Sequence, residues 1–119
     1  MATSMLIESS DGSELQRFSE LDQSFIFLGI SGCQSCTTMK AALTLVFKDR
    51  PAPDLLLFQA DRPDEATAAF LQQHIAGGFP EFLYFAGGER KRRWIGFFKD
   101  EDFDTKVRLL GEIIDNCRP

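Results

Sequence analysis

Positive charge is scarce in this sequence of 119 residues, because 13 lysines and arginines stand against 18 aspartates and glutamates. The formal net charge is therefore −5 at neutral pH. Nucleic acids and anionic membrane surfaces attract proteins through a positive field. The composition therefore predicts no general binding to nucleic acid or to a membrane surface.

Long apolar runs are absent as well. No stretch of the sequence approaches the roughly 20 apolar residues that an α-helix needs to cross a bilayer. Residues 1–7 contain no basic segment followed by a long apolar one, so we expect no signal peptide. Together these absences predict a cytoplasmic location.

Histidine and cysteine are too few for an obvious metal centre, with one histidine, His74, and three cysteines. A closed structural zinc site needs four ligands, and Cys117 lies far along the chain from Cys33 and Cys36. We therefore expect no metal and no cofactor. Because the number of cysteines is odd, at least one thiol lacks a partner within the chain.

What the sequence does contain is a pair of thiols three positions apart, Cys33 and Cys36. An apolar run at residues 25–30 precedes the pair, and a helical pattern at residues 37–47 follows it. The free N–H groups and positive dipole end of a helix's first turn favour a thiolate. We expect the sulfur of Cys33 near the surface and that of Cys36 more covered, as an attacking and a resolving thiol should be in disulfide exchange.

The rest of the chain alternates between strand and helix patterns, and its 44% hydrophobic residues, with 12 phenylalanines, suffice for a core. We expect a short first strand that ends at residues 6–7. The apolar runs 24–30 and 55–60 predict strands buried on both faces. Adjacent glycines at 87 and 88 predict a hairpin between strands 81–85 and 91–97. Helical spacing marks residues 14–21, 37–47, 65–74 and 100–117.

This order predicts one α/β domain over residues 1–119, with parallel strands first and an antiparallel hairpin at the edge of the sheet. Asp11 or Ser13 is available to cap the first helix, and Asp100 the last. Pro63 suits the first position of the third helix.

The order of elements resembles that of thioredoxin-like proteins. The resemblance depends on Cys33 and Cys36 at the strand-to-helix junction and on Gly78, Phe79 and Pro80 before the hairpin, and it covers most of the chain. It implies a three-layer sandwich with a mixed sheet of four or five strands flanked by helices. It also implies a cis peptide bond at Pro80 that lies against the two sulfurs, whereas a trans proline at the start of an edge strand is the ordinary alternative.

The same resemblance implies a thiol–disulfide oxidoreductase that reduces or exchanges protein disulfides through Cys33 and Cys36. A reductase or glutathione would then restore the dithiol. In this interpretation the residues that bind the substrate are Gly32, Gln34, Ser35, Phe79 and Pro80.

Several positions depart from the thioredoxin pattern. The usual buried aspartate and its lysine neighbour are replaced by apolar residues, and a carboxylate follows the proline. We expect that carboxylate near the thiols, where it would disfavour a thiolate. A second hypothesis is therefore a thioredoxin-fold binding or redox-sensing module with little or no turnover. The departures are Phe27 for aspartate, Leu57 for lysine, Glu81 for threonine, Gly32 for tryptophan and Gln34-Ser35 for Gly-Pro.

Four further features each allow two interpretations. Cys117 is either a half-buried apolar residue or a thiol for an intermolecular disulfide. His74 is either a surface residue or a proton carrier near the thiols. The basic residues 90–93 form either a solvated edge or a docking patch for an acidic partner. Phe79 and residues 97–98, if exposed beside the thiols, would form an apolar substrate platform.

Overall fold

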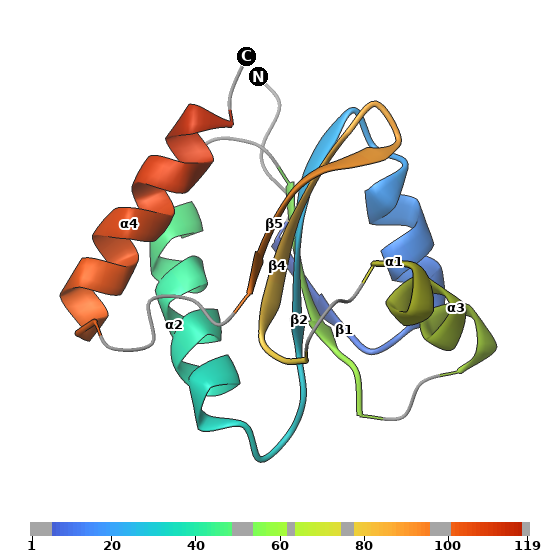
Figure 1. Ribbon diagram of the computed structural model, residues 1–119, viewed down its shortest axis with the longest axis horizontal. Coiled ribbons are helices and arrows are strands. Elements are labelled where there is room, and N and C mark those ends of the chain that lie inside the picture. Colours follow the sequence, from blue (N-terminus) through green and yellow to red (C-terminus); the bar gives the residue numbers. More distant parts are fainter. Residues whose placement is uncertain (1–5, 49–53, 62–63, 75–77, 96–100, 118–119) are drawn as a thin grey trace.

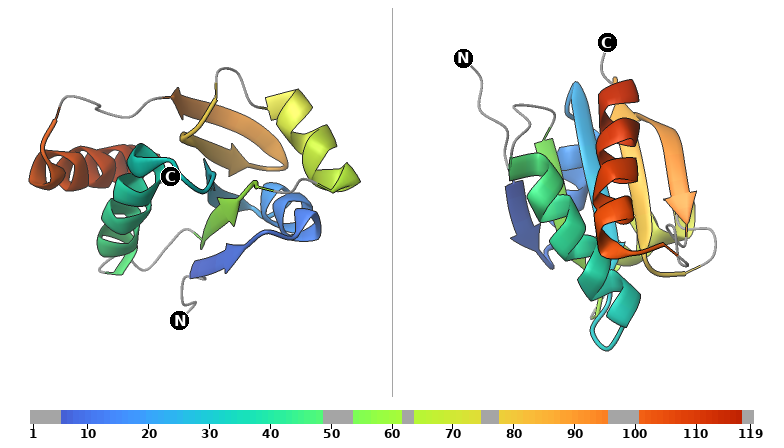
Figure 2. Two further views of the ribbon diagram at one scale, coloured as in Figure 1. Left: turned by 90° about the horizontal axis from the view of Figure 1, so that it is seen from below. Right: turned by 90° about the vertical axis from the view of Figure 1, so that its left-hand side faces the viewer.

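The structure, a computed structural model, describes residues 6–48, 54–61, 64–74, 78–95 and 101–117. Within these ranges five strands form one sheet, with α2 and α4 on one face and α1 and α3 on the other (Figures 1 and 2). The elements in chain order are β1 (Leu6–Ser9), α1 (Gly12–Ser19), β2 (Gln23–Gly29), α2 (Gln34–Lys48), β3 (Asp54–Gln59), α3 (Glu65–His74), β4 (Glu81–Ala86), β5 (Glu89–Ile95) and α4 (Phe103–Asn116).

The sheet is mixed, with strand order β1-β3-β2-β4-β5. β1 and β2 each pair in parallel with β3, whereas β4 is antiparallel to β2 and β5 is antiparallel to β4. The predicted three-layer α/β sandwich is therefore confirmed, with its parallel strands and its antiparallel hairpin. The parallel strands end at one edge of the sheet, which brings the residues that follow β2 and β3 together.

β2 lies at the centre of the fold and is buried on both faces. Phe25 and Phe27 belong to the core cluster under α2 and α4, and Ile26 and Leu28 belong to the cluster under α1 and α3. This division follows from the alternation of side chains along a strand. It accounts for the continuous apolar run in the sequence.

Phenylalanine rings fill much of the core on the α2 side. The ring of Phe25 stacks on Phe82 at a centroid distance of 5.0 Å and meets the edge of Phe47 at 5.8 Å. Full burial of one such side chain contributes about 1.5–3 kcal/mol to stability. The cluster thereby fixes α2 against the sheet, and α2 carries the second cysteine.

The helix starts agree only in part with the prediction. Asp11 caps α1 by accepting a hydrogen bond from the N–H of Ser13 at 3.0 Å. α4 begins at Phe103, later than predicted, because residues 101 and 102 are not helical and Asp102 caps the helix through the N–H of Thr105 at 2.8 Å. A capping side chain must reach the free N–H groups of the first turn, and the course of the backbone decides which residue does so.

The predicted roles of Pro63, Asp100 and residues 96–98 fall outside the described residues. No helix in the described ranges combines the length and the apolar character that crossing a bilayer would require.

α1 and α3 meet at Gly12, the first residue of α1. The carboxylate of Asp64 accepts a hydrogen bond from the backbone N–H of Thr67 at 2.8 Å, and this bond lowers the pKa of Asp64. A methyl group added at Gly12 would lie 2.6 Å from both Asp64 Oδ1 and Thr67 Oγ1 and 2.9 Å from the backbone nitrogen of Thr67. The contact between the two helices therefore requires a residue without a side chain.

We expect Gly12→Ala to lower the free energy of unfolding by about 1 kcal/mol or more. Overpacking costs about 1–3 kcal/mol, and the better helix propensity of alanine offsets at most about 1 kcal/mol of this. Urea unfolding followed by circular dichroism measures the change. The exposed Gln16→Ala on the same helix should change stability by less than about 0.5 kcal/mol, and equal stability of Gly12→Ala and wild type would contradict the packing argument.

Candidate active site

Cys33 and Cys36 form a disulfide bond at the start of α2, with their Cα atoms 5.2 Å apart. α2 begins at Gln34, earlier than predicted, so Cys33 directly precedes the helix and Cys36 lies in its first turn. Cys36 is 4% exposed, whereas Cys33 is half-buried. The two sulfurs therefore differ in exposure as the sequence predicts.

The helix N-terminus supports a negative charge on the first sulfur. The backbone N–H of Cys36 donates a hydrogen bond to the sulfur of Cys33 at 3.1 Å, and the N–H of Thr37 donates to the carbonyl of Cys33 at 3.1 Å. An N–H group directed at sulfur and the positive end of the helix dipole both favour the thiolate over the thiol. Once the disulfide is reduced, Cys33 is therefore suited to act as a nucleophile.

A polar network that the sequence analysis missed holds the loop before the cysteines. The N–H and hydroxyl of Ser31 donate to the two carboxylate oxygens of Asp61 at 2.6 and 2.7 Å. Gln59 donates to the same carboxylate at 3.0 Å. The sequence contains a signal for this network, because a polar residue follows each of two strands that are predicted to be parallel neighbours. Such strands end side by side, which brings the two residues together.

The expected substrate-binding residues divide between two segments. Gly32, Gln34 and Ser35 are exposed around Cys33, and Gly32 has a φ of +75°, which favours glycine in this turn. Phe79 is half-buried and Pro80 is buried, and the peptide bond between them is cis. Phe79 and Cys33 both pack at the edge of the core cluster under α2. A role of these five residues in substrate binding stays a prediction.

The two apolar replacements lie beneath the second cysteine. Phe27 and Leu57 are 2% and 4% exposed and belong to the same core cluster as Cys36. The ring of Phe27 and the Cβ of Cys36 both border Gly29, where an added methyl group would lie 2.9 Å and 3.3 Å from them. Neither Phe27 nor Leu57 can exchange a proton or carry a charge.

Glu81, the carboxylate expected near the thiols, is fully buried on the other side of the sheet. Phe82 faces α2 and Leu83 faces α3, so the alternation along β4 directs Glu81 to the α3 side. Its carboxylate accepts a hydrogen bond from the N–H of Gly78 at 3.4 Å. The sequence predicts this carboxylate near the thiols, whereas the alternation along β4 places it on the face of the sheet opposite the cluster that contains Cys36.

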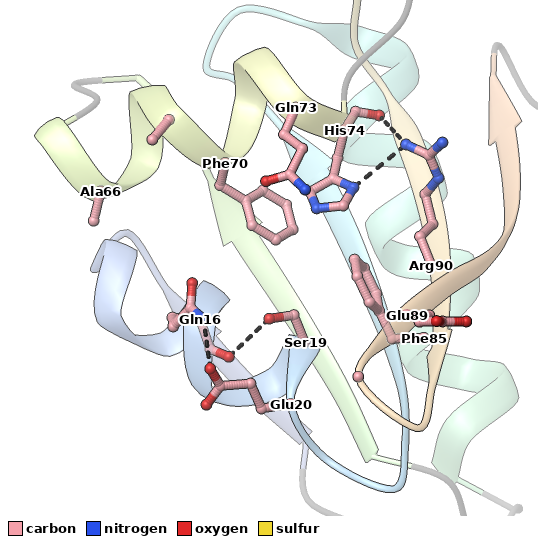
Figure 3. A pocket seen from close by; sticks show the side chains of 12 residues that line it. Gln16, Ser19, Glu20, Ala66, Phe70, Gln73, His74, Phe85, Glu89 and Arg90 are labelled. Carbon is pink, nitrogen blue, oxygen red and sulfur yellow. Dashed lines mark hydrogen bonds between the residues drawn. The ribbon is translucent and has the colours of Figure 1, made fainter.

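His74 lines a different pocket, of about 590 Å³, between α1, α3 and the hairpin (Figure 3). Its ring packs on Phe70 and Phe85 at 4.6 and 5.2 Å, and Arg90 lies within 3.4 Å of its Nδ1. Partial burial and the positive charges of Arg90 and Arg93 lower the pKa of His74. These contacts offer no support for a role of His74 at the dithiol.

The basic residues of β5 have partners within the chain. Arg90 and Arg93 both donate to the carbonyl oxygen of His74 at 3.1 Å, and Lys91 pairs with Glu89 at 2.9 Å. The guanidinium of Arg92 lies 5.4 Å from the ring centre of Trp94. These contacts favour the interpretation of β5 as a solvated edge strand.

Cys117 is half-buried at the end of α4, and burial raises the pKa of its thiol. Its carbonyl oxygen accepts a hydrogen bond from the hydroxyl of Tyr84 at 3.0 Å. These features favour the interpretation of Cys117 as an apolar residue. In the described part of the chain, no three or more histidine, cysteine or carboxylate side chains gather in a group that could hold a metal ion.

Comparison with solved structures identifies the fold. Thioredoxin O2 from Arabidopsis thaliana superposes with a TM-score of 0.72 at 13% identity, over 98% of this chain and 96% of that one. The chain has the thioredoxin fold. A mutant thioredoxin from Halobacterium salinarum gives a TM-score of 0.65 at 16% identity, over 94% of each chain. Within this thioredoxin fold, Cys33 and Cys36 form a pair with Cys-x-x-Cys spacing.

A third similar structure is Trxlp from Edwardsiella tarda, with a TM-score of 0.60 at 20% identity over 88% of this chain and 97% of that one. No protein-family model matches the sequence, and no curated protein is similar to it. At these identities the likeness establishes the thioredoxin fold and leaves the activity to be argued from the site.

We expect His74 to make stability depend on pH. In the unfolded chain a histidine takes up a proton near about pH 6.5, whereas folded His74 does so only at lower pH because its pKa is lowered. Below about pH 6.5 the unfolded state therefore binds more protons, and the free energy of unfolding falls. Urea unfolding at several pH values should show a smaller loss between about pH 7 and about pH 5 in His74→Gln than in wild type. Equal losses would contradict this assignment.

Proposed function

We propose that this protein is a thiol–disulfide oxidoreductase that reduces or exchanges disulfide bonds of other proteins. The observation that carries the proposal is the disulfide between half-buried Cys33 and buried Cys36 at the start of α2. The N–H of Cys36 lies 3.1 Å from the sulfur of Cys33 and favours its thiolate. A thiolate at the surface with a partner thiol one turn away can both attack and release a substrate.

In the proposed reaction the reduced Cys33 thiolate attacks one sulfur of a substrate disulfide. A bond forms between Cys33 and that sulfur, and the other substrate sulfur leaves with the electron pair as a thiolate. The Cys36 thiolate then attacks the sulfur of Cys33. The substrate sulfur that was bonded to Cys33 leaves as a thiolate, and the Cys33–Cys36 disulfide remains. The substrate is reduced by two electrons and the protein is oxidised by two.

The surroundings of Cys33 support a protein substrate. Gly32, Gln34 and Ser35 are exposed beside it, where an extended segment of another chain could lie. In this proposal Phe79 and Pro80 position that segment, and a reductase or glutathione restores the dithiol. A cytoplasmic location, with residues 1–119 acting as one domain, fits a pair that must be kept reduced between turnovers.

A second function, a binding or redox-sensing module with little turnover, is favoured by one observation. Phe27 and Leu57 surround the buried Cys36 with apolar groups, which disfavour its thiolate. A dithiol whose second member reacts slowly is suited to report the redox state to a bound partner. The rate of disulfide reduction distinguishes this function from the first.

We expect the wild-type protein to accelerate the reduction of insulin by dithiothreitol, and Cys33→Ser to abolish the acceleration because the more exposed, attacking thiolate is missing. Reduced Cys36→Ser mixed with insulin after removal of dithiothreitol should accumulate a mixed disulfide through Cys33, because the resolving thiol is missing. Turbidity of the released insulin chains measures the rate, and mass spectrometry detects the mixed disulfide.

The matched control is Cys117→Ser, which removes the remaining cysteine and should keep the wild-type rate. Circular dichroism establishes that each variant is folded. An unaccelerated reaction with folded wild-type protein would reject the oxidoreductase and favour the redox-sensing module.

A further inference from the structure

The second step of the proposed reaction places an unusual demand on Cys36. Its sulfur must become a thiolate to attack Cys33, yet the residue is only 4% exposed. Phe27 and Met39 belong to the same buried cluster. Burial among apolar groups disfavours a thiolate, so a nearby positive charge would be needed to offset this cost.

A pocket beside Cys36 supplies both access to water and one charged side chain. The pocket has a volume of about 300 Å³ and opens between the start of α2 and the ends of β2 and β3. Among its described lining residues, Lys40 is the one that carries a charge. The lining consists of Phe27, Ile30, Ser31, Gly32, Cys36, Thr37, Lys40 and Gln59.

Helix geometry directs Lys40 toward Cys36. The two residues are four positions apart on α2, which places their Cβ atoms about 5–6 Å apart on one face. Side chains on a helix lean toward its N-terminus, so Lys40 extends over the turn that contains Cys36. The shared pocket is consistent with this direction.

Glu8 on the edge strand β1 also contacts Lys40. Lys40 and Glu8 form a salt bridge, with their side chains 40% and 59% exposed. A second pocket of about 200 Å³ is lined by Glu8 and shares Phe27, Lys40 and Gln59 with the first. Lys40 therefore pairs with the carboxylate of Glu8 and lines the same pocket as Cys36.

The other charged groups around this pocket are accounted for by the structure. Asp61, after β3, accepts hydrogen bonds from Ser31 and Gln59. On β4, the carboxylate of Glu81 lies on the opposite side of the sheet. On α2, Lys48 is exposed at the far end of the helix from Cys36.

We propose that the ammonium group of Lys40 stabilises the thiolate of Cys36 during release of the substrate, and that Glu8 moderates this effect by competing for the same ammonium group. The proposal deepens the oxidoreductase function and depends on it for its role in turnover. The proton of Cys36 passes to water in the pocket. The Cys36 sulfur then bonds to that of Cys33, and the bond between Cys33 and the substrate breaks, with its electron pair passing to the substrate sulfur.

The test measures the ultraviolet absorbance of the Cys36 thiolate against pH in full-length protein carrying Cys33→Ser and Cys117→Ser. In this background we expect Lys40→Gln to raise the midpoint by about half a unit to one unit, because a partly exposed positive charge is lost. Lys40→Arg should restore the midpoint, and Lys48→Gln should leave it unchanged. Glu8→Gln should lower it, since the ammonium group is then free to turn to the sulfur.

The opposite signs expected for Lys40→Gln and Glu8→Gln separate an electrostatic role from a structural one. If the salt bridge only held α2 against β1, breaking it from either side would move the midpoint in the same direction. An unchanged midpoint in Lys40→Gln, or a shift of the same sign in both variants, overturns the proposal.

A second measurement tests whether the charge of Lys40 also affects the rate of disulfide reduction. With both active-site cysteines present, Lys40→Gln should shift the pH profile of insulin reduction upward by the same amount, and Lys40→Arg should restore it. The thiolate titration does not require turnover, so it remains readable if insulin is not reduced. A shifted titration without reduction would reject the oxidoreductase, and an unshifted titration with normal reduction would reject the role of Lys40.

Discussion

The position of the two sulfurs depends on the burial of β2 between two layers of helices. Its residues Phe25 and Phe27 pack under α2 and α4, and Ile26 and Leu28 pack under α1 and α3. Packing on both faces fixes where β2 ends, and the parallel strand β3 beside it ends at the same edge of the sheet. The turn after β2 starts at this edge, and Ser31 and Asp61 join it to the end of β3 through two short hydrogen bonds.

From that edge the chain enters α2, where Cys36 and Met39 near the start and Phe47 near the end pack into the core under the helix. The sulfur of Cys33 accepts a hydrogen bond from the N–H of Cys36, and Cys36 itself is buried. The N-terminus of the helix can stabilise a negative charge on the sulfur of Cys33. The apolar side chains of Phe27 and Leu57 cannot stabilise such a charge on the buried sulfur of Cys36. Our proposal assigns the compensating charge for the second sulfur to Lys40, which lines the pocket beside Cys36.

Much of the architecture was predictable because it follows from local patterns. The buried runs of β2 and β3, the glycines between β4 and β5, and the spacing of Cys33 and Cys36 each determine a short segment by itself. The predictions failed or fell short where the answer depended on the path of the backbone. α4 begins only at Phe103, with Asp102 as its cap, and the alternation along β4 turns Glu81 away from α2. In each case two arrangements were equally good locally.

By itself the sequence determined which segments become strands and helices, and that two thiols meet where a strand passes into a helix, because these properties depend on neighbours along the chain. Only the tertiary structure decided which side chains surround those thiols. Lys40 and Glu8 are 32 positions apart in the sequence and join only because β1 adds to the sheet beside β3, next to α2. Charge and burial at a sulfur depend on distances through space, and the order of residues does not contain them.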